Sequence, residues 1–431
     1  MKTINHLFKT IGCIFLLMLL FSCNQEKKQV VQLQDIQQYL ELFEDTSLKK
    51  LQTNLKFWED KLAATPTQFP YNVKIAGIES QLFSKTGNIE HLKKAEMLLK
   101  NAVERSGSKQ SGYLRALARN YISQHQFKKA LDLLETAEAN GDKKQETIKM
   151  LFDVHLELGN NDTAKQYLSN IENKRSFDYL IRIAKWQDHK GDLDATISYM
   201  EEALQGAKEK GYEGLITWCE TNLADYYGHH GDIEKSYQYY LKTLEKNPAD
   251  VYALKKIAWI AFSHDKNIDQ AKYIISKVKK RYAGADIDLL AYEIALYDNN
   301  YIKQTFEEYW SEVSKAGYGQ MYNKYNFDIL TANKEYNQAY ELALKEVENR
   351  PTAQSYSLLA LAAAHVENPS KGMEIIKENN VLKSYEPEVL LRVAKVYALN
   401  NKKELIKPLK QELLGAEFEL GPVKAIEIEK L

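Results

Sequence analysis

Few residues of this 431-residue chain have the spacing that a catalytic or metal site requires. Asp225 and His229 lie four residues apart, so both could face one side of a helix and offer a metal ion two ligands. Such a site needs further ligands, and the sequence contains no His-Glu-x-x-His motif. Cys219 could act as a nucleophile, but no supporting histidine and aspartate can be recognised around it. A small apolar core residue is therefore the favoured interpretation of Cys219.

Other signatures of catalysis are missing from the sequence. It has no Gly-rich phosphate loop, no Gly-x-Ser-x-Gly turn and no paired Cys-x-x-Cys motif. Carboxylates are abundant, but no two of them stand out as an acid and a base. We therefore expect a protein that is not an enzyme and that holds no metal and no cofactor. A hidden site would have to lie in region 287–313 or in the C-terminal tail.

The N-terminus carries the signals of export. Lys2 and Lys9 precede an apolar stretch over residues 11–21, which is shorter than the roughly 20 residues that a membrane-spanning helix needs. The sequence Leu20-Phe21-Ser22-Cys23 resembles the lipobox of bacterial lipoproteins. This resemblance implies that Cys23 is acylated, becomes the first mature residue and anchors the protein in the cell envelope, with Asn24 compatible with the outer membrane. An ordinary secretory signal, or an uncleaved anchor, is the alternative.

The overall composition favours helices and a nearly neutral protein. The 58 Lys and Arg residues against 59 Asp and Glu give a formal net charge of −1, which offers no overall attraction to nucleic acid or anionic lipid. We therefore expect no nucleic-acid partner, and contact with a membrane through the lipid anchor only. Only 8 prolines and 19 glycines interrupt the chain, which favours long helices over a turn-rich sheet.

Apolar residues return at a fixed interval of 34 residues. Leu114, Leu117, Ala130 and Leu134 recur as Ile148, Leu151, Ala164 and Leu168. Each unit has apolar residues three and four apart on two stretches, the pattern of two amphipathic helices. The unit that contains Leu223-Ala224, Tyr227, Gly231-Asp232, Ser236, Tyr240 and Pro248 resembles the tetratricopeptide repeat (TPR). The resemblance implies an all-α, right-handed superhelical solenoid of helix-turn-helix repeats, with nine or ten helix pairs.

The strength of the period divides the chain into six predicted parts. They are a signal peptide at 1–22, a lipidated tether at 23–34, N-terminal helices with divergent repeats at 35–110, a regular TPR array at 111–283, divergent TPR-like repeats at 284–414 and a tail at 415–431. The tail, which includes Pro422, has no predicted structure.

The resemblance also implies a concave groove lined by the first helix of each pair. The positions that face the groove in this family correspond here to Arg115, Arg119, Lys149, Asp153, Lys185, Asp225, His229, Lys255 and Trp259. Such a mixture of charges and aromatic rings could hold a protein or peptide ligand. An ordinary solvated helix face is the alternative for any single position.

Two hypotheses of function follow from the anchor and the repeats. The first is a membrane-anchored scaffold that mediates protein–protein interaction in the bacterial cell envelope. The second is an outer-membrane lipoprotein that captures a glycan or other nutrient for a transporter, because Trp218, Trp259 and Trp310 could stack on sugars. The sequence leaves the partner, the oligomeric state and the side of the membrane open.

Overall fold

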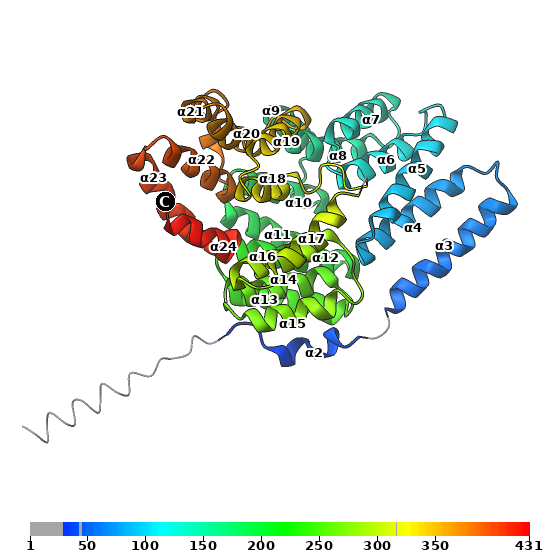
Figure 1. The fold of residues 1–431 in the computed structure, drawn as a ribbon. Coiled ribbons are helices and arrows are strands. Elements are labelled where there is room, and N and C mark those ends of the chain that lie inside the picture. The colour runs from blue at the N-terminus through cyan, green and yellow to red at the C-terminus, as the bar shows by residue number, and fades with distance from the viewer. Residues whose placement is uncertain (1–28, 43–44, 316) are drawn as a thin grey trace, which may run out of the picture.

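The computed structural model describes residues 29–42, 45–315 and 317–431, and the regular structure in these ranges is helical (Figure 1). Ten helix pairs follow one another along this described part of the chain, which confirms the predicted all-α solenoid. The pairs are α4 (Pro70–Thr86) and α5 (Ile89–Arg105), α6 (Ser111–Ser123) and α7 (Phe127–Asn140), α8 (Lys144–Glu157) and α9 (Asn161–Asn170), α10 (Phe177–His189) and α11 (Leu193–Glu209), α12 (Glu213–His229) and α13 (Ile233–Lys246), α14 (Val251–Ser263) and α15 (Ile268–Val278), α16 (Ala285–Asp298) and α17 (Ile302–Val313), α18 (Asn323–Ala332) and α19 (Tyr336–Asn349), α20 (Ala353–Val366) and α21 (Pro369–Glu378), and α22 (Pro387–Leu399) and α23 (Lys403–Gly415).

Four further helices lie outside these ten pairs in the described part of the chain. They are α2 (Leu33–Leu40) and α3 (Thr46–Ala64) before the array, the short 3-10 helix η1 (Val381–Lys383) within it, and α24 (Glu417–Glu429) after it. None of the helices in the described ranges combines the length and the apolar content that crossing a bilayer requires.

In two of the helix pairs, the turn follows from a Gly-Asp sequence. Gly231 follows α12 with a φ of 91°, a left-handed conformation that glycine adopts without steric cost. Asp232 then caps α13, because its carboxylate accepts a hydrogen bond of 3.1 Å from the backbone N–H of Lys235. Gly191 and Asp192 repeat this arrangement between α10 and α11. The dipeptide thus ends one helix and begins the next.

Small residues set the spacing between paired helices. Ala130, Ala164 and Ala184 have no exposed surface. Thr196 takes a close-contact position where most units have a smaller residue, and it is also fully buried. Its hydroxyl donates to the carbonyl of Asp192 at 2.8 Å and reaches that of Ala184 at 3.3 Å. These bonds offset the cost of burying the hydroxyl.

The superhelix closes on itself at two seams that the repeat pattern does not predict. At the first seam, the backbone N–H of Ala283 donates to the carbonyl of Thr86 at 2.8 Å. Gly87 makes this contact possible, since an added Cβ would lie only 2.4 Å from the backbone nitrogen of Gly284. The turn after α4 therefore packs directly against the turn before α16.

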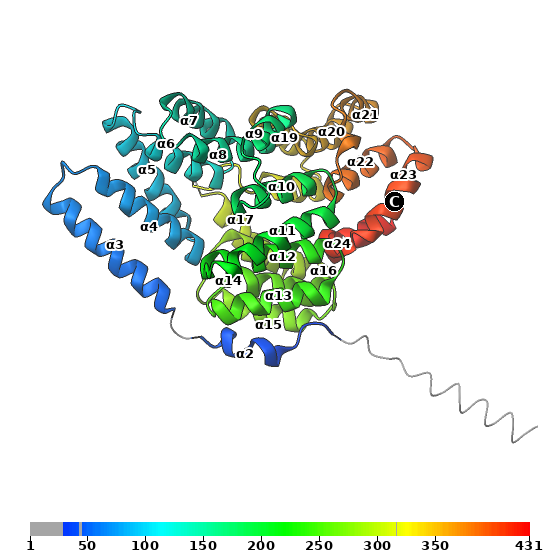
Figure 2. The same ribbon diagram turned by 180° about the vertical axis from the view of Figure 1, so that it is seen from behind.

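The second seam joins the repeats around residue 157 to those around residue 350. The side-chain amide of Asn349 donates to the carbonyl of His125 at 3.1 Å, and the Arg350 guanidinium lies 3.5 Å from the Glu157 carboxylate. In both views, α5 to α9 and α18 to α22 lie across the top of the molecule, with α11 to α16 below them (Figures 1 and 2). Helices from both halves of the chain therefore surround the inner surface of the superhelix.

The N-terminal segment is docked from residue 29 onward. The backbone N–H groups of Val30 and Val31 donate to the Asp265 carboxylate at 3.0 and 2.9 Å, and Val31 is 1% exposed. Val30 and Val31 of the predicted tether are therefore docked on the repeats, whereas Gln29, Leu33 and Gln34 are exposed. The signal peptide and Cys23 lie outside the described residues, so their assignments stay predictions.

Candidate functional site

A hollow of about 670 Å³ opens on the inner surface of the superhelix. Its walls are formed mainly by α12, α14, α16, α18, α22 and α24, and we call it the inner hollow. The five cationic residues that line it each have a carboxylate partner; they are Lys255, Lys256, Lys324, Arg350 and Lys424. The hollow thus combines paired charges with aromatic rings, which suits a polar ligand with apolar parts.

Four of the nine predicted groove residues line the inner hollow: Asp225, His229, Lys255 and Trp259. Asp225 is already well satisfied, since it accepts from Tyr240 and Tyr252 at 2.8 and 2.7 Å and pairs with Lys256 at 2.8 Å.

The surroundings of Asp225 and His229, which both lie on α12, also set their ionisation. Burial opposes ionisation of Asp225, but the Lys256 ammonium and the two tyrosine hydroxyls outweigh it and keep the pKa of Asp225 below its usual value. Burial and Lys256 lower the pKa of His229, which favours a neutral ring. The described residues contain no group of three or more His, Cys, Asp or Glu side chains arranged to hold a metal ion.

Four other predicted groove residues form contacts between neighbouring repeats. Lys149 pairs with Asp178 at 2.6 Å and Asp153 with Arg182 at 2.9 Å. The remaining two are Arg115, which is buried and donates to the carbonyl of Asp142 and the hydroxyl of Thr147, and Lys185, which pairs with Glu157 at 3.0 Å. Of the nine, Arg119 is exposed at the surface of α6. A role in ligand binding stays a prediction for all of these positions.

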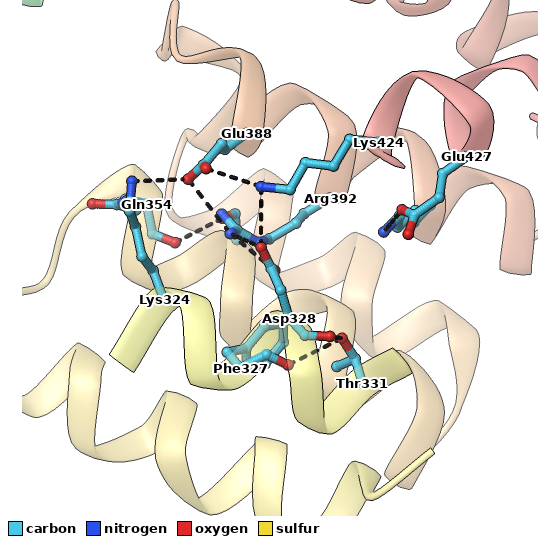
Figure 3. Close-up of polar contacts among 11 residues, drawn as sticks. Lys324, Phe327, Asp328, Thr331, Gln354, Glu388, Arg392, Lys424 and Glu427 are labelled. Atoms are coloured by element: carbon cyan, nitrogen blue, oxygen red, sulfur yellow. Dashed lines mark hydrogen bonds and ion pairs between the residues drawn. The ribbon is translucent and has the colours of Figure 1, made fainter. Parts of the chain in front are cut away.

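Sequence reasoning missed a cluster of charges that joins three helices (Figure 3). We call Lys324, Asp328, Glu388, Arg392 and Lys424 the charge cluster. Asp328 on α18 accepts from Arg392 Nη2 on α22 at 3.1 Å and lies 3.2 Å from Lys424 Nζ on α24. Glu388 lies 3.0 Å from Lys424 Nζ and 3.2 Å from Lys324 Nζ. Burial opposes ionisation of both carboxylates, but the surrounding cations outweigh it and hold both pKa values below their usual range.

Glu293 and Glu419, which line the inner hollow, form none of the ion pairs seen among the described residues. Burial, reinforced by the negative charge of Glu388, raises the pKa of Glu293 and of Glu419 to about 7. Glu293 lies on α16 and Glu419 on α24, so the hollow contains two groups that change charge near neutral pH. Both side chains keep some contact with solvent.

This titration gives a testable prediction for Glu293→Gln. The folded pKa of about 7 exceeds the unfolded value, so stability from the neutral carboxyl is complete below about pH 4.5 and is lost as the pH rises through 7. Glutamine stays neutral, so we expect the stability advantage of Glu293→Gln over the parent to grow between pH 5 and pH 8. Denaturant unfolding at both pH values measures it. The exposed Glu348→Gln is the control, and an advantage that does not grow with pH would contradict the expectation.

Packing accounts for Cys219, and the three tryptophans lie apart from one another. Cys219 has no exposed surface, and burial followed by the nearby Glu220 raises the pKa of its thiol to about 12, which keeps it protonated and unreactive at neutral pH. The three tryptophans of the glycan hypothesis lie in separate side-chain clusters. Trp218 contacts Phe177, Trp259 contacts Phe262, and Trp310 stacks on Phe306. They do not form one sugar-binding platform.

The predicted groove contains the chain's own C-terminal tail. Trp259 Nε1 and Ser263 Oγ both donate to the backbone carbonyl of Phe418, at 3.0 and 2.8 Å. The tail region 415–431, left without structure by sequence analysis, ends α23 at Gly415 and then forms α24. This helix contacts α12, α14 and α16 as well as α22 and α23.

Comparisons with known proteins bear on the fold only. No family model matches the chain, and no curated protein matches it. Solved structures similar to it include a human IFIT1 dimer with PPP-AAAA (15% identity, 77% of this chain and 78% of that chain, TM-score 0.41). Another is yeast Tom70, with 14% identity over 89% of this chain and 91% of that chain and a TM-score of 0.35. A third is the APC/C hetero-tetramer Cut9–Hcn1, with 14% identity over 87% of this chain and 95% of that chain and a TM-score of 0.36. The architecture of the chain is TPR-like.

One expectation needs correction. We expected no nucleic-acid partner because the net charge is −1, yet the similar IFIT1 structures contain PPP-AAAA and m7Gppp-AAAA. That exclusion is wrong, since a helical-repeat protein can hold an oligonucleotide. The physical reason is that net charge averages over the whole chain and does not describe how charges are placed at any one surface.

Proposed function

We propose that the protein is a scaffold that holds a segment of a partner protein in the inner hollow. The observation that carries this proposal is the hollow itself, about 670 Å³ in volume and lined by charged and aromatic side chains from several helices. Fixed charges on rigid helices can orient a peptide through hydrogen bonds, while Trp259, Tyr322 and Tyr325 offer apolar contact area.

The N-terminal signals support a place for this scaffold in the bacterial cell envelope. Acylation of Cys23 would tie the body to lipid, and Asn24 is compatible with the outer membrane. Docking of the chain begins at Gln29, six residues after Cys23, and an extended segment of this length spans at most about 20 Å. An anchor at Cys23 would therefore hold the face formed by α2, α13 and α15 near the membrane.

Site-specific crosslinking in intact cells tests the proposal. We replace Met321, which lines the inner hollow, with a photo-crosslinking amino acid, and use Lys128 on the exposed surface of α7 as the matched control. We expect the probe at 321 to capture one protein at least tenfold more than the probe at 128. Nuclease treatment of the product distinguishes a protein partner from an oligonucleotide. Equal capture by both probes, or capture of nucleic acid alone, would contradict the proposal.

A further inference from the structure

The tail is bound as a peptide ligand would be bound, through its main chain. The carbonyl of Phe418 receives two side-chain hydrogen bonds from α14, one from Trp259 and one from Ser263. Recognition of a backbone carbonyl does not depend on the identity of the residue that carries it. The Phe418 ring in turn lies against α12 at Gly228, where an added Cβ would come within 2.9 Å of the ring.

A kink in the tail fits the same wall. Gly421 has φ 81° and ψ 164°, a conformation that essentially only glycine adopts, and Pro422 follows it. An added Cβ at Gly421 would lie 2.6 Å from the indole of Trp259. The Gly-Pro step therefore lets the backbone approach Trp259 closely and then turn toward α22.

Lys424 is the third residue of the tail that binds the repeats. Its ammonium lies 3.2 Å from the Asp328 carboxylate and 3.0 Å from the Glu388 carboxylate (Figure 3). Residues 418–424 thus present three features in order, an aromatic ring, a Gly-Pro kink and a lysine. All three contact the inner surface of the repeats, which is the surface we propose for partner binding.

Two features of the tail's contacts favour its release. The outer ion pairs that hold it, Lys266 with Glu417 and Lys395 with Glu427, have side chains 32–45% exposed, and pairs of that kind contribute little. A cleft of about 80 Å³ also remains where residues 420–424 face α16 and α18, so the fit on that side is incomplete.

We propose that the surface formed by α12, α14, α16, α18 and α22 is a peptide-binding site that the chain's own residues 417–429 occupy at rest. A partner protein displaces them with a segment of the same chemistry, which is an aromatic residue, Gly-Pro three and four positions later, and Lys six positions later. Because Phe418, Glu419, Leu420 and Lys424 line the inner hollow, release of the tail also widens the hollow. This inference rests on the proposed function and names the kind of segment that the scaffold takes.

The test uses the full chain with a protease site inserted at the exposed Gly415, cleaved only after folding. A fluorescent peptide of residues 416–431 is then added and its anisotropy is measured. We expect the peptide to bind the cleaved chain at least tenfold more tightly than the uncleaved chain, because the attached tail competes at a high effective concentration. A matched peptide that carries Gly421→Ala and Lys424→Glu is expected to bind at least tenfold more weakly than the native one.

Hydrogen exchange on the intact chain gives a second, independent readout. We expect the amides of α24 to exchange at least tenfold faster than those of α22. The proposal is overturned by equal protection of α24 and α22, by loss of helicity on cleavage, or by equal binding of the two peptides. If these tests fail while the probe at Met321 still captures a partner, the scaffold function stands and the tail is a permanent part of the fold.

Discussion

Replacement of Arg392 by methionine is expected to lower the free energy of unfolding by about 3 kcal/mol, the lower end of what breaking a buried ion pair costs. The Arg392 side chain is 3% exposed and holds Asp328 through both Nε and Nη2, at 3.3 and 3.1 Å. Methionine fills similar space but leaves Asp328 with Lys424 as its cation. Denaturant unfolding followed by circular dichroism measures the loss, and hydrogen exchange should locate it in α18 and α22.

Lys395→Met is the matched control for this substitution. Lys395 lies on the same helix and pairs with Glu427 at 2.6 Å, but the two side chains are 32% and 40% exposed. Exposed pairs contribute about 0–1 kcal/mol, so the control should lose no more than that. A similar loss in both variants would mean that the charge cluster contributes no more than an ordinary surface pair.

The repeat period predicted the helices because it records contacts between neighbours. Ala130 and Ala164, 34 residues apart, are both fully buried where paired helices meet, so the same physical demand returns in each unit. The seams between Gly87 and Gly284, and between Glu157 and Arg350, follow no period. They depend on how small rotations between repeats accumulate around the superhelix, which no local pattern encodes.

Part of the candidate site was predicted because the repeat register also indicates which residues face inward. Register within a repeat identifies the inner face, and four of the residues that it selected, Asp225, His229, Lys255 and Trp259, line the inner hollow, while their role in binding stays a prediction. It cannot show which charges of the inner face neutralise one another. Lys149 with Asp178, Asp153 with Arg182 and Lys185 with Glu157 join residues 28 or 29 positions apart, because first helices of neighbouring units lie side by side.

The sequence contains the charge pairs of the charge cluster, but their spacing alone does not distinguish a buried cluster from a solvated helix surface. Lys324 and Asp328 are four residues apart on α18, and Glu388 and Arg392 are four apart on α22. Each pair alone is typical of a solvated helix surface. Only the structure shows that the two helices face each other, with Lys424 of the tail between their carboxylates. The tail is thereby both the element that sequence analysis left blank and a wall of the site.

Cys23→Ser is expected to move the protein from the membrane fraction to the soluble fraction, with at least a tenfold drop in the membrane-bound share. Each buried methylene of an acyl chain contributes about 0.8 kcal/mol, and two chains hold a protein far more firmly than one. Serine cannot form the thioether that carries the lipid.

Cys13→Ser is the control, because Cys13 lies in the predicted signal segment and leaves with it. Cell fractionation and labelling with radioactive palmitate measure the outcome. The parent and Cys13→Ser should be labelled and sediment with membranes, while Cys23→Ser should do neither. An unlabelled parent would instead identify an ordinary secretory signal, and it would rule out the lipid anchor that we propose next to the face formed by α2, α13 and α15.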